Sequence, residues 1–129
     1  MEVVASRVLL HPDDLVRSLA FYRDTLGLPV YREWGEEGLP GHGTVFFLGG
    51  GYLELSNHSG ATPNDKLELW WQVRDIDATH AEMRAAEVEI VEAPTDKPWG
   101  LREMRMRDPD GVTIVVVEIP KSHPLRYRP

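Results

Sequence analysis

The sequence contains no cysteine, so it can form neither disulfides nor thiolate metal sites, and it has no thiol nucleophile. No stretch approaches the ~20 consecutive apolar residues that a transmembrane helix needs. The first residues, MEVVASRVLLHPDD, lack the charged start, apolar run and cleavage site of a signal peptide. We therefore expect a cytoplasmic protein that does not bind membranes.

Basic residues are scarce outside the C-terminal end. The 129-residue chain has a net charge of −7, and its last nine residues, KSHPLRYRP, hold three basic and no acidic side chains, so residues 1–120 carry −10. We expect 1–120 to form a single domain, with 121–129 as a basic tail. An acidic domain repels the phosphate backbone, so nucleic acid is not an expected partner, whereas a neutral or cationic small ligand is compatible. The simpler interpretation is that the acids only solvate the surface.

Common catalytic motifs are also missing. The sequence has no phosphate-binding loop, no zinc-ligand spacing and no Ser-His-Asp order, and the GGG run at 49–51 is typical of a hairpin turn. No catalytic residue can be assigned from these patterns.

Two segments have the periodicity of amphipathic helices. After Asp14, Leu15, Leu19 and Tyr22 recur at helical spacing until Gly27, a residue suited to end a helix in the left-handed conformation. After Asp75 the same spacing recurs, but Glu87 stands where glycine would be expected. If the left-handed end is kept, Glu87 costs about 1 kcal/mol.

Segments with strand character surround each helix. They are 3–10, 29–34, 43–48 and 51–56 around the first, and 67–73, 88–93 and two runs within 101–120 around the second. The order is strand, helix, three strands, twice over, and an offset of 61 residues aligns Asp14 with Asp75, Arg7 with Glu68 and Glu54 with Val115. This predicts an α+β fold of two βαβββ modules, at about 1–60 and 61–120.

Three strings, DDLVRSLAFYRDTLGLPV, WWQVRDIDATHAEMRAA and RDPDGVTIVVVE, resemble the glyoxalase/bleomycin-resistance/extradiol dioxygenase (vicinal oxygen chelate) superfamily. The resemblance implies that the two modules form a curved half-barrel enclosing a cleft, in a homodimer with intertwined or paired modules. It also implies a metal-ligand position on the first and the last strand of each module. Here these positions hold Arg7, Glu54, Glu68 and Val115.

These residue types do not suit a metal. Arginine has no lone pair to donate and valine has no donor atom, so we expect no metal and no cofactor. Arg7 is instead expected to pair with Glu54, Glu68 or both. The alternative is that these residues form an ion pair with no functional role.

Period-two alternation predicts which residues accompany these carboxylates. Trp70 shares a face with Glu68, and Tyr52 with Glu54, whereas Trp71 points to the helix side. A two-residue turn at 49–51 brings Phe47 to the same face, and a three-residue turn brings Phe46. Trp34 and Trp99 are expected at the rims, and Met104 shares a strand face with Met106, although parity does not say which face. The predicted ligand-binding residues are Arg7, Trp34, Phe47, Tyr52, Glu54, Glu68, Trp70, Trp99 and Met104.

The histidines fall on none of the ligand positions that the resemblance implies. We expect them to be structural or exposed, with two in loops able to swing over the cleft, His42 and His58.

The leading functional hypothesis is a metal-free binding protein of bleomycin-resistance type that confers antibiotic resistance. It would sequester a small aromatic ligand, possibly cationic, such as an antibiotic or other natural product. The alternative is a lyase, isomerase or dioxygenase of the same superfamily that uses Glu54 or Glu68, with or without a divalent metal. A third possibility is an interaction module without a small ligand.

Overall fold

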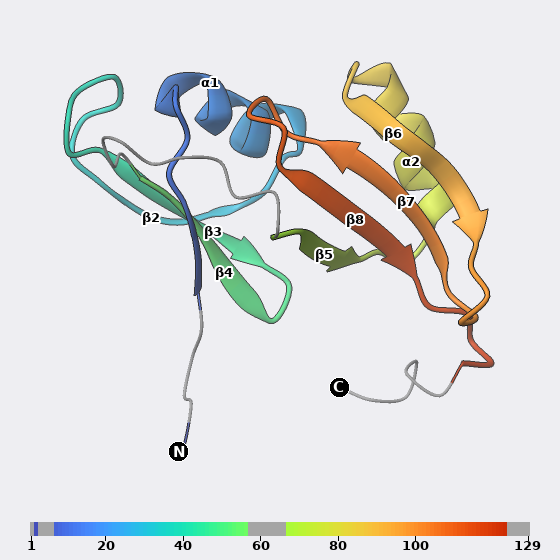
Figure 1. Cartoon of the computed structure of the whole chain (residues 1–129). Coiled ribbons are helices and arrows are strands. Elements are labelled where there is room, and N and C mark those ends of the chain that lie inside the picture. Colours follow the sequence, from blue (N-terminus) through green and yellow to red (C-terminus); the bar gives the residue numbers. More distant parts are fainter. Residues whose placement is uncertain (1, 3–6, 57–66, 124–129) are drawn as a thin grey trace. The chain divides into compact units, whose positions relative to one another are not determined.

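The computed structural model describes residues 2, 7–56 and 67–123. The chain divides into two compact units, Met1–Pro63 and Asn64–Pro129, and each contains one four-stranded sheet and one helical segment (Figure 1). The elements of the first unit are β1 (Arg7–Leu10), α1 (Leu15–Leu19), the π-helix η1 (Ala20–Thr25), β2 (Val30–Trp34), β3 (Gly43–Leu48) and β4 (Gly51–Ser56). Those of the second unit are β5 (Leu69–Gln72), α2 (Ile76–Ala85), β6 (Glu89–Asp96), β7 (Arg102–Arg107) and β8 (Thr113–Glu118).

The two sheets have the same topology. Their strand orders are β1-β4-β3-β2 and β5-β8-β7-β6, and in each sheet the first strand pairs in parallel with the last while the other pairs are antiparallel. The predicted α+β fold of two βαβββ modules is therefore confirmed. Part of the predicted first strand, 3–6, and the end of the basic tail, 124–129, lie outside the described residues.

An aspartate begins each helical segment. The side chain of Asp14 accepts a hydrogen bond from the backbone nitrogen of Arg17 at 3.1 Å, and Asp75 accepts one from Ala78 at 3.0 Å. Each carboxylate satisfies a donor that the first turn leaves unpaired. The predicted helix ends are also observed, because Gly27 and Glu87 have φ of 70° and 60°.

The helical segments differ in length by one residue. The first runs from Leu15 to Thr25 and the second from Ile76 to Ala85, and the second half of the first is π-helical. A π turn accommodates one residue more than an α turn. The sequence pattern predicted a regular helix here, because the buried positions Leu15, Leu19 and Tyr22 fit either geometry over so short a span.

The hairpin turns compensate for this difference. In the first unit Leu48 pairs with Gly51 across a two-residue turn, whereas in the second the backbone nitrogen of Asp108 donates to the carbonyl of Val112 across three residues. Asp108 shapes the longer turn, because its carboxylate accepts from the backbone nitrogens of Asp110 and Val112. The added residue restores the 61-residue offset, and Leu9 is level with Glu54 as Trp70 is with Val115.

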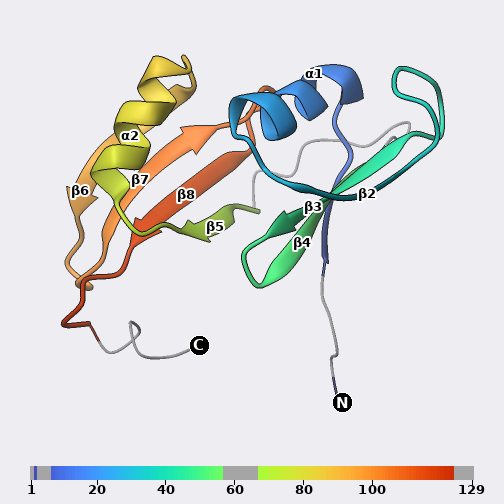
Figure 2. The same cartoon turned by 180° about the vertical axis from the view of Figure 1, so that it is seen from behind.

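Each unit buries its core between the helix and one face of its sheet. In the first unit Tyr22 packs against Phe46 with 6.5 Å between ring centroids. In the second, Arg102 of β7 forms an ion pair with Asp77 of α2 at 3.0 Å, so the alternate β7 residues Met104 and Met106 also face α2, which covers the sheet in Figure 2.

Met104 therefore belongs to the core. It is fully buried and is opposite Val116 on β8, on the face that α2 covers. The expectation that Met104 contacts a ligand is corrected accordingly, because the β7 residues on the other face of the sheet are Glu103, Arg105 and Arg107.

Candidate ligand-binding faces

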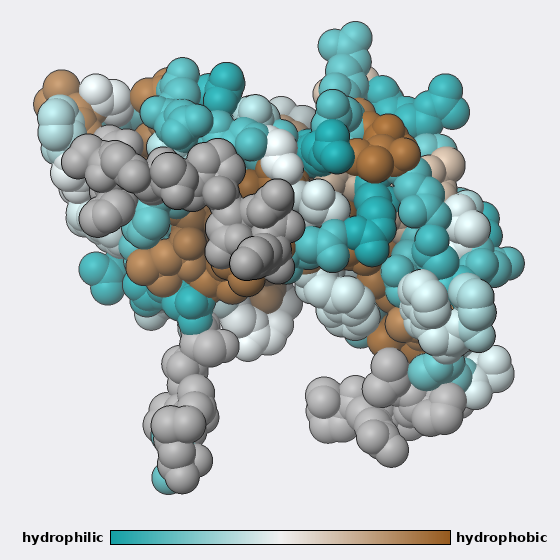
Figure 3. All heavy atoms as spheres, viewed as in Figure 1, coloured by the Kyte–Doolittle hydropathy of each residue, from teal (hydrophilic) through white to brown (hydrophobic). Residues whose placement is uncertain are grey.

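The helix-free face of the first sheet carries most of the predicted binding residues of that unit. Because Phe46 faces the helix, its neighbour Phe47 faces the other way, and Phe47 is paired with Tyr52 as Val45 is with Glu54. This confirms the two-residue turn that was needed to bring Phe47 to the side of Glu54. Hydrophobic surface is visible in the region of β3 and β4 in Figure 3.

Three aromatic rings form a cluster on this face. Tyr31 lies 4.9 Å from Phe47 and 5.1 Å from Tyr52, and the rings of Phe47 and Tyr52 are 5.9 Å apart. Tyr31 and Phe47 are 48% and 43% exposed, so the cluster presents aromatic surface to solvent. Sequence alternation missed Tyr31, because a bulge between Val30 and Arg32 breaks the period of two.

Arg7 and Glu54 form an ion pair beside the aromatic cluster. The Nη1 atom of Arg7 lies 2.9 Å from Oε1 of Glu54, and the hydroxyl of Ser56 donates to Oε2 at 3.0 Å. Both oxygens of this buried carboxylate therefore accept a hydrogen bond. The predicted pairing of Arg7 with Glu54 is confirmed.

Trp34 lies across the face at the end of β2. A Cβ atom at Gly43 would fall 2.1 Å from the indole ring, so only glycine leaves room for this ring position. The guanidinium of Arg32 lies 5.4 Å from the ring centroid, within range of a cation–π contact.

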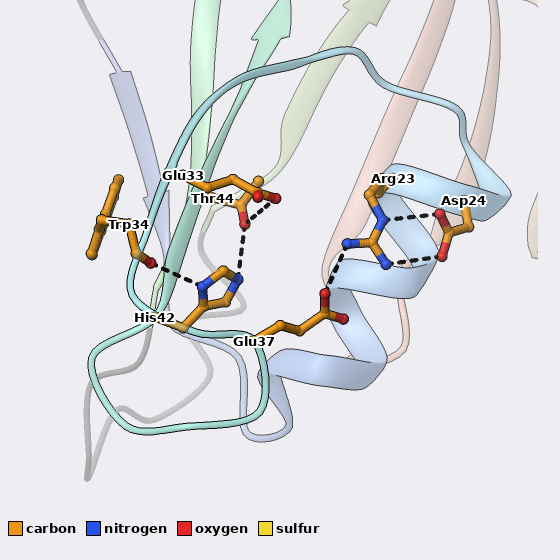
Figure 4. A network of polar contacts seen from close by, with 7 residues as sticks. All are labelled: Arg23, Asp24, Glu33, Trp34, Glu37, His42 and Thr44. Atoms are coloured by element: carbon orange, nitrogen blue, oxygen red, sulfur yellow. Dashed lines mark hydrogen bonds and ion pairs between the residues drawn. The ribbon is translucent and has the colours of Figure 1, made fainter.

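His42 fixes the loop that follows Trp34. Its Nδ1 lies 2.9 Å from the carbonyl of Trp34 and its Nε2 lies 3.2 Å from the hydroxyl of Thr44 (Figure 4). Since a carbonyl only accepts, Nδ1 carries the donated proton. His42 is buried, so the structural interpretation of this histidine is confirmed and the idea that it swings outward is wrong. His58 lies outside the described residues.

The same loop is tied to the helical segment by Arg23. Its guanidinium donates to both carboxylate oxygens of Asp24 and, at 3.2 Å, to Glu37 (Figure 4). These hydrogen bonds raise the pKa of Arg23 and lower that of Asp24. The loop between β2 and β3 is thus held at both of its sides.

The helix-free face of the second sheet carries Glu68, Trp70 and Val115. Trp70 is 51% exposed and level with Val115, as period-two alternation predicts. Glu68 accepts a hydrogen bond from Arg105 of β7, which also approaches Glu92. The sequence reasoning missed Arg105, because its face depends on the pairing between β7 and β8.

Trp99 and Glu103 meet at the end of this second face. The indole nitrogen of Trp99 donates to Oε2 of Glu103 at 2.7 Å, and Glu103 is buried. Trp99 was expected at a rim, and its ring is largely exposed. Glu103 was not singled out from the sequence, although its parity with Arg105 would place both on one face once the β7 register was known.

The residues at the metal-ligand positions do not fit a metal in either unit. The first unit supplies one carboxylate that is already bonded to arginine, and the second supplies one carboxylate paired with Arg105 together with Val115. Within residues 2, 7–56 and 67–123, no three His, Asp or Glu side chains cluster in a way that could hold a metal ion. We therefore derive no chemistry through a metal here.

Comparison with known proteins agrees with this architecture. Residues 5–116 match the model of the Glyoxalase/Bleomycin resistance protein/Dioxygenase superfamily, so the chain belongs to this superfamily. It is 27% identical over 124 residues to the uncharacterized protein YraH of Bacillus subtilis (strain 168), a match that covers 85% of this chain and 92% of YraH.

Solved structures of the same fold bear different functional names. TnmS3, an antibiotic binding protein from Streptomyces sp. CB03234, is 22% identical with a TM-score of 0.76, over 92% of this chain and 98% of TnmS3. A lactoylglutathione lyase from Agrobacterium tumefaciens is 25% identical with a TM-score of 0.68, over 92% of this chain and 94% of the lyase. Among the described residues, no helix is both long and apolar enough to cross a bilayer.

Proposed function

We propose that this chain is a metal-free binding protein that sequesters a small aromatic compound, such as an antibiotic or another natural product, without transforming it. The observation that carries the proposal is the exposed cluster of Tyr31, Phe47 and Tyr52 beside the Arg7–Glu54 ion pair. Aromatic side chains bind flat ligands by stacking and edge contacts. The described name of the similar protein TnmS3 supports the same class of ligand.

The two carboxylates of the enzymatic alternative are both occupied. Glu54 accepts hydrogen bonds at both oxygens, and exposed Glu68 is paired with Arg105. A general base must reach a substrate proton with a free lone pair, and these bonds compete with that role. The geometry therefore favours binding over acid–base catalysis.

A homodimer in the cytoplasm, free of any cofactor, completes the proposal. Its support is the superfamily membership and the absence of cysteine from the sequence. Sedimentation equilibrium of the purified protein tests the dimer, and a single species of 14.6 kDa would contradict it.

Ligand binding can be tested with a panel of anthraquinones and other polycyclic natural products. We expect a compound that raises the melting temperature and is recovered unchanged by chromatography after prolonged incubation. Phe47→Ala and Tyr52→Ala should each weaken its binding by about 10-fold, since loss of a stacking contact removes about 1 kcal/mol or more. Val16→Ala, at an exposed position on α1, is the control and should leave the affinity unchanged.

The opposite outcome is equally specific. Turnover of a catechol, or of the adduct between a diketone and glutathione, that disappears in Glu54→Gln or Glu68→Gln would establish the enzyme and refute sequestration. Equal affinity of the wild type and both aromatic variants would show that the ligand binds elsewhere.

A further inference from the structure

Glu103 differs from the other carboxylates on the helix-free face of the second sheet. The others each have a basic partner, in the pairs Glu68–Arg105, Glu92–Lys97 and Glu89–Arg107. Glu103 is only 5% exposed, and among the described residues its one hydrogen-bond donor is the neutral indole of Trp99. The most buried of these acids is thus the one without a cation.

The surroundings of Glu103 make this arrangement costly. Glu103 is opposite Val117 on β8, and Val117 belongs to a buried apolar cluster with Leu101, Val115 and Ile119. A buried carboxylate is normally paired with a cation, because an apolar environment replaces little of the lost hydration. One indole N–H satisfies one oxygen and leaves the negative charge uncompensated.

The second carboxylate oxygen of Glu103 is accessible. Within the described residues, the one fully buried side-chain nitrogen or oxygen that lacks a hydrogen-bond partner is Oγ of Ser18. Oε1 of Glu103 has no donor in that same part of the chain, so it retains contact with solvent. An incoming donor can therefore reach it.

Trp99 is held next to this oxygen by a tight turn. The backbone nitrogen of Gly100 donates to the carbonyl of Lys97 at 2.9 Å, and that of Lys97 donates to Leu101 at 2.8 Å. Gly100 has φ of 89°, a conformation that favours glycine. The turn leaves the Trp99 ring 57% exposed while its nitrogen points to Glu103.

We propose that Trp99 and Glu103 form a recognition site for a protonated amine or guanidinium group on the bound aromatic compound. The inference rests on the proposed function and specifies the chemistry of its ligand. The cation of the ligand donates to Oε1 of Glu103 and lies against the exposed ring of Trp99, where both the carboxylate and the ring quadrupole attract it.

Two tricyclic probes of similar shape test this site, cationic proflavine and neutral acridone. Their dissociation constants are measured by calorimetry for the wild type, Glu103→Gln and Glu89→Gln. We expect the wild type to bind proflavine about 10-fold more tightly than acridone or better, as for a hydrogen bond to a charged group. Glu103→Gln keeps the shape and the acceptor for Trp99 but lowers the preference to about 1, whereas the control Glu89→Gln retains it.

The salt dependence and a second variant separate a binding role from a structural one. Trp99→Phe keeps an aromatic ring and the charge of Glu103, so it should retain a preference for proflavine, and circular dichroism should show that each variant is folded. Equal affinities of the wild type for both probes would overturn the cation site and leave sequestration intact. Binding of neither probe would contradict sequestration of flat aromatics, and the cation site with it.

Discussion

The strength of the Arg7–Glu54 pair can be calculated from its burial and measured by a double-mutant cycle. The side chains are 36% and 11% exposed, so the pair lies between an exposed pair, worth about 0.2–1 kcal/mol, and a buried one, whose disruption costs about 3–5 kcal/mol. We expect Arg7→Met to destabilise the protein by about 1–2 kcal/mol, since it leaves Glu54 with Ser56 as its remaining donor. Glu54→Leu in the Arg7→Met background should recover most of this loss.

The assay is urea unfolding of the wild type, both single variants and the double variant, with the coupling energy taken from the four free energies of unfolding. The exposed pair Arg107–Glu89, with 3.8 Å between nitrogen and oxygen, is the control, and its coupling should be below about 0.5 kcal/mol. A coupling between Arg7 and Glu54 as small as that of the control would refute the view that this ion pair organises the face.

Three further substitutions test local features. Ser18→Ala should stabilise the protein by about 1 kcal/mol in urea unfolding, because it removes a fully buried hydroxyl without a partner among the described residues, and a loss of stability would show that the hydroxyl is bonded. Glu87→Gly should raise the free energy of unfolding by about 0.5–1 kcal/mol, since glycine adopts the observed φ of 60° without strain, and an unchanged value would contradict the left-handed helix end. Gly43→Ala should destabilise by about 1–3 kcal/mol through its clash with the Trp34 ring, and Trp34→Ala should relieve this effect in the double variant; additive losses would show that the two positions do not touch.

The sequence predicted the elements well because both of its signals are local. Asp14 and Asp75 cap the helices through contacts three residues away, and the Gly49–Gly51 run restricts the hairpin to a small set of turns. The π turn was not predictable, since inserting one residue into a helix leaves the spacing of its buried residues nearly unchanged over two turns.

The candidate site was predictable only where parity could be counted from a fixed point. Phe47 followed from the turn, and Trp70 followed from its spacing to Glu68. Tyr31 and Met104 did not, because the first depends on a bulge and the second on which neighbour β7 pairs with. Strand faces set by long-range pairing need the register, which periodicity alone does not contain.

The paired length changes, one residue more in the first helical segment and one fewer in the first hairpin turn, have a practical consequence for engineering. Every position on one helix-free face retains a counterpart 61 residues away, as Leu9 has in Trp70 and Glu54 has in Val115. The chain therefore offers two interchangeable platforms. Side chains can be transplanted from either half to the other by simple addition or subtraction, with no loop to redesign.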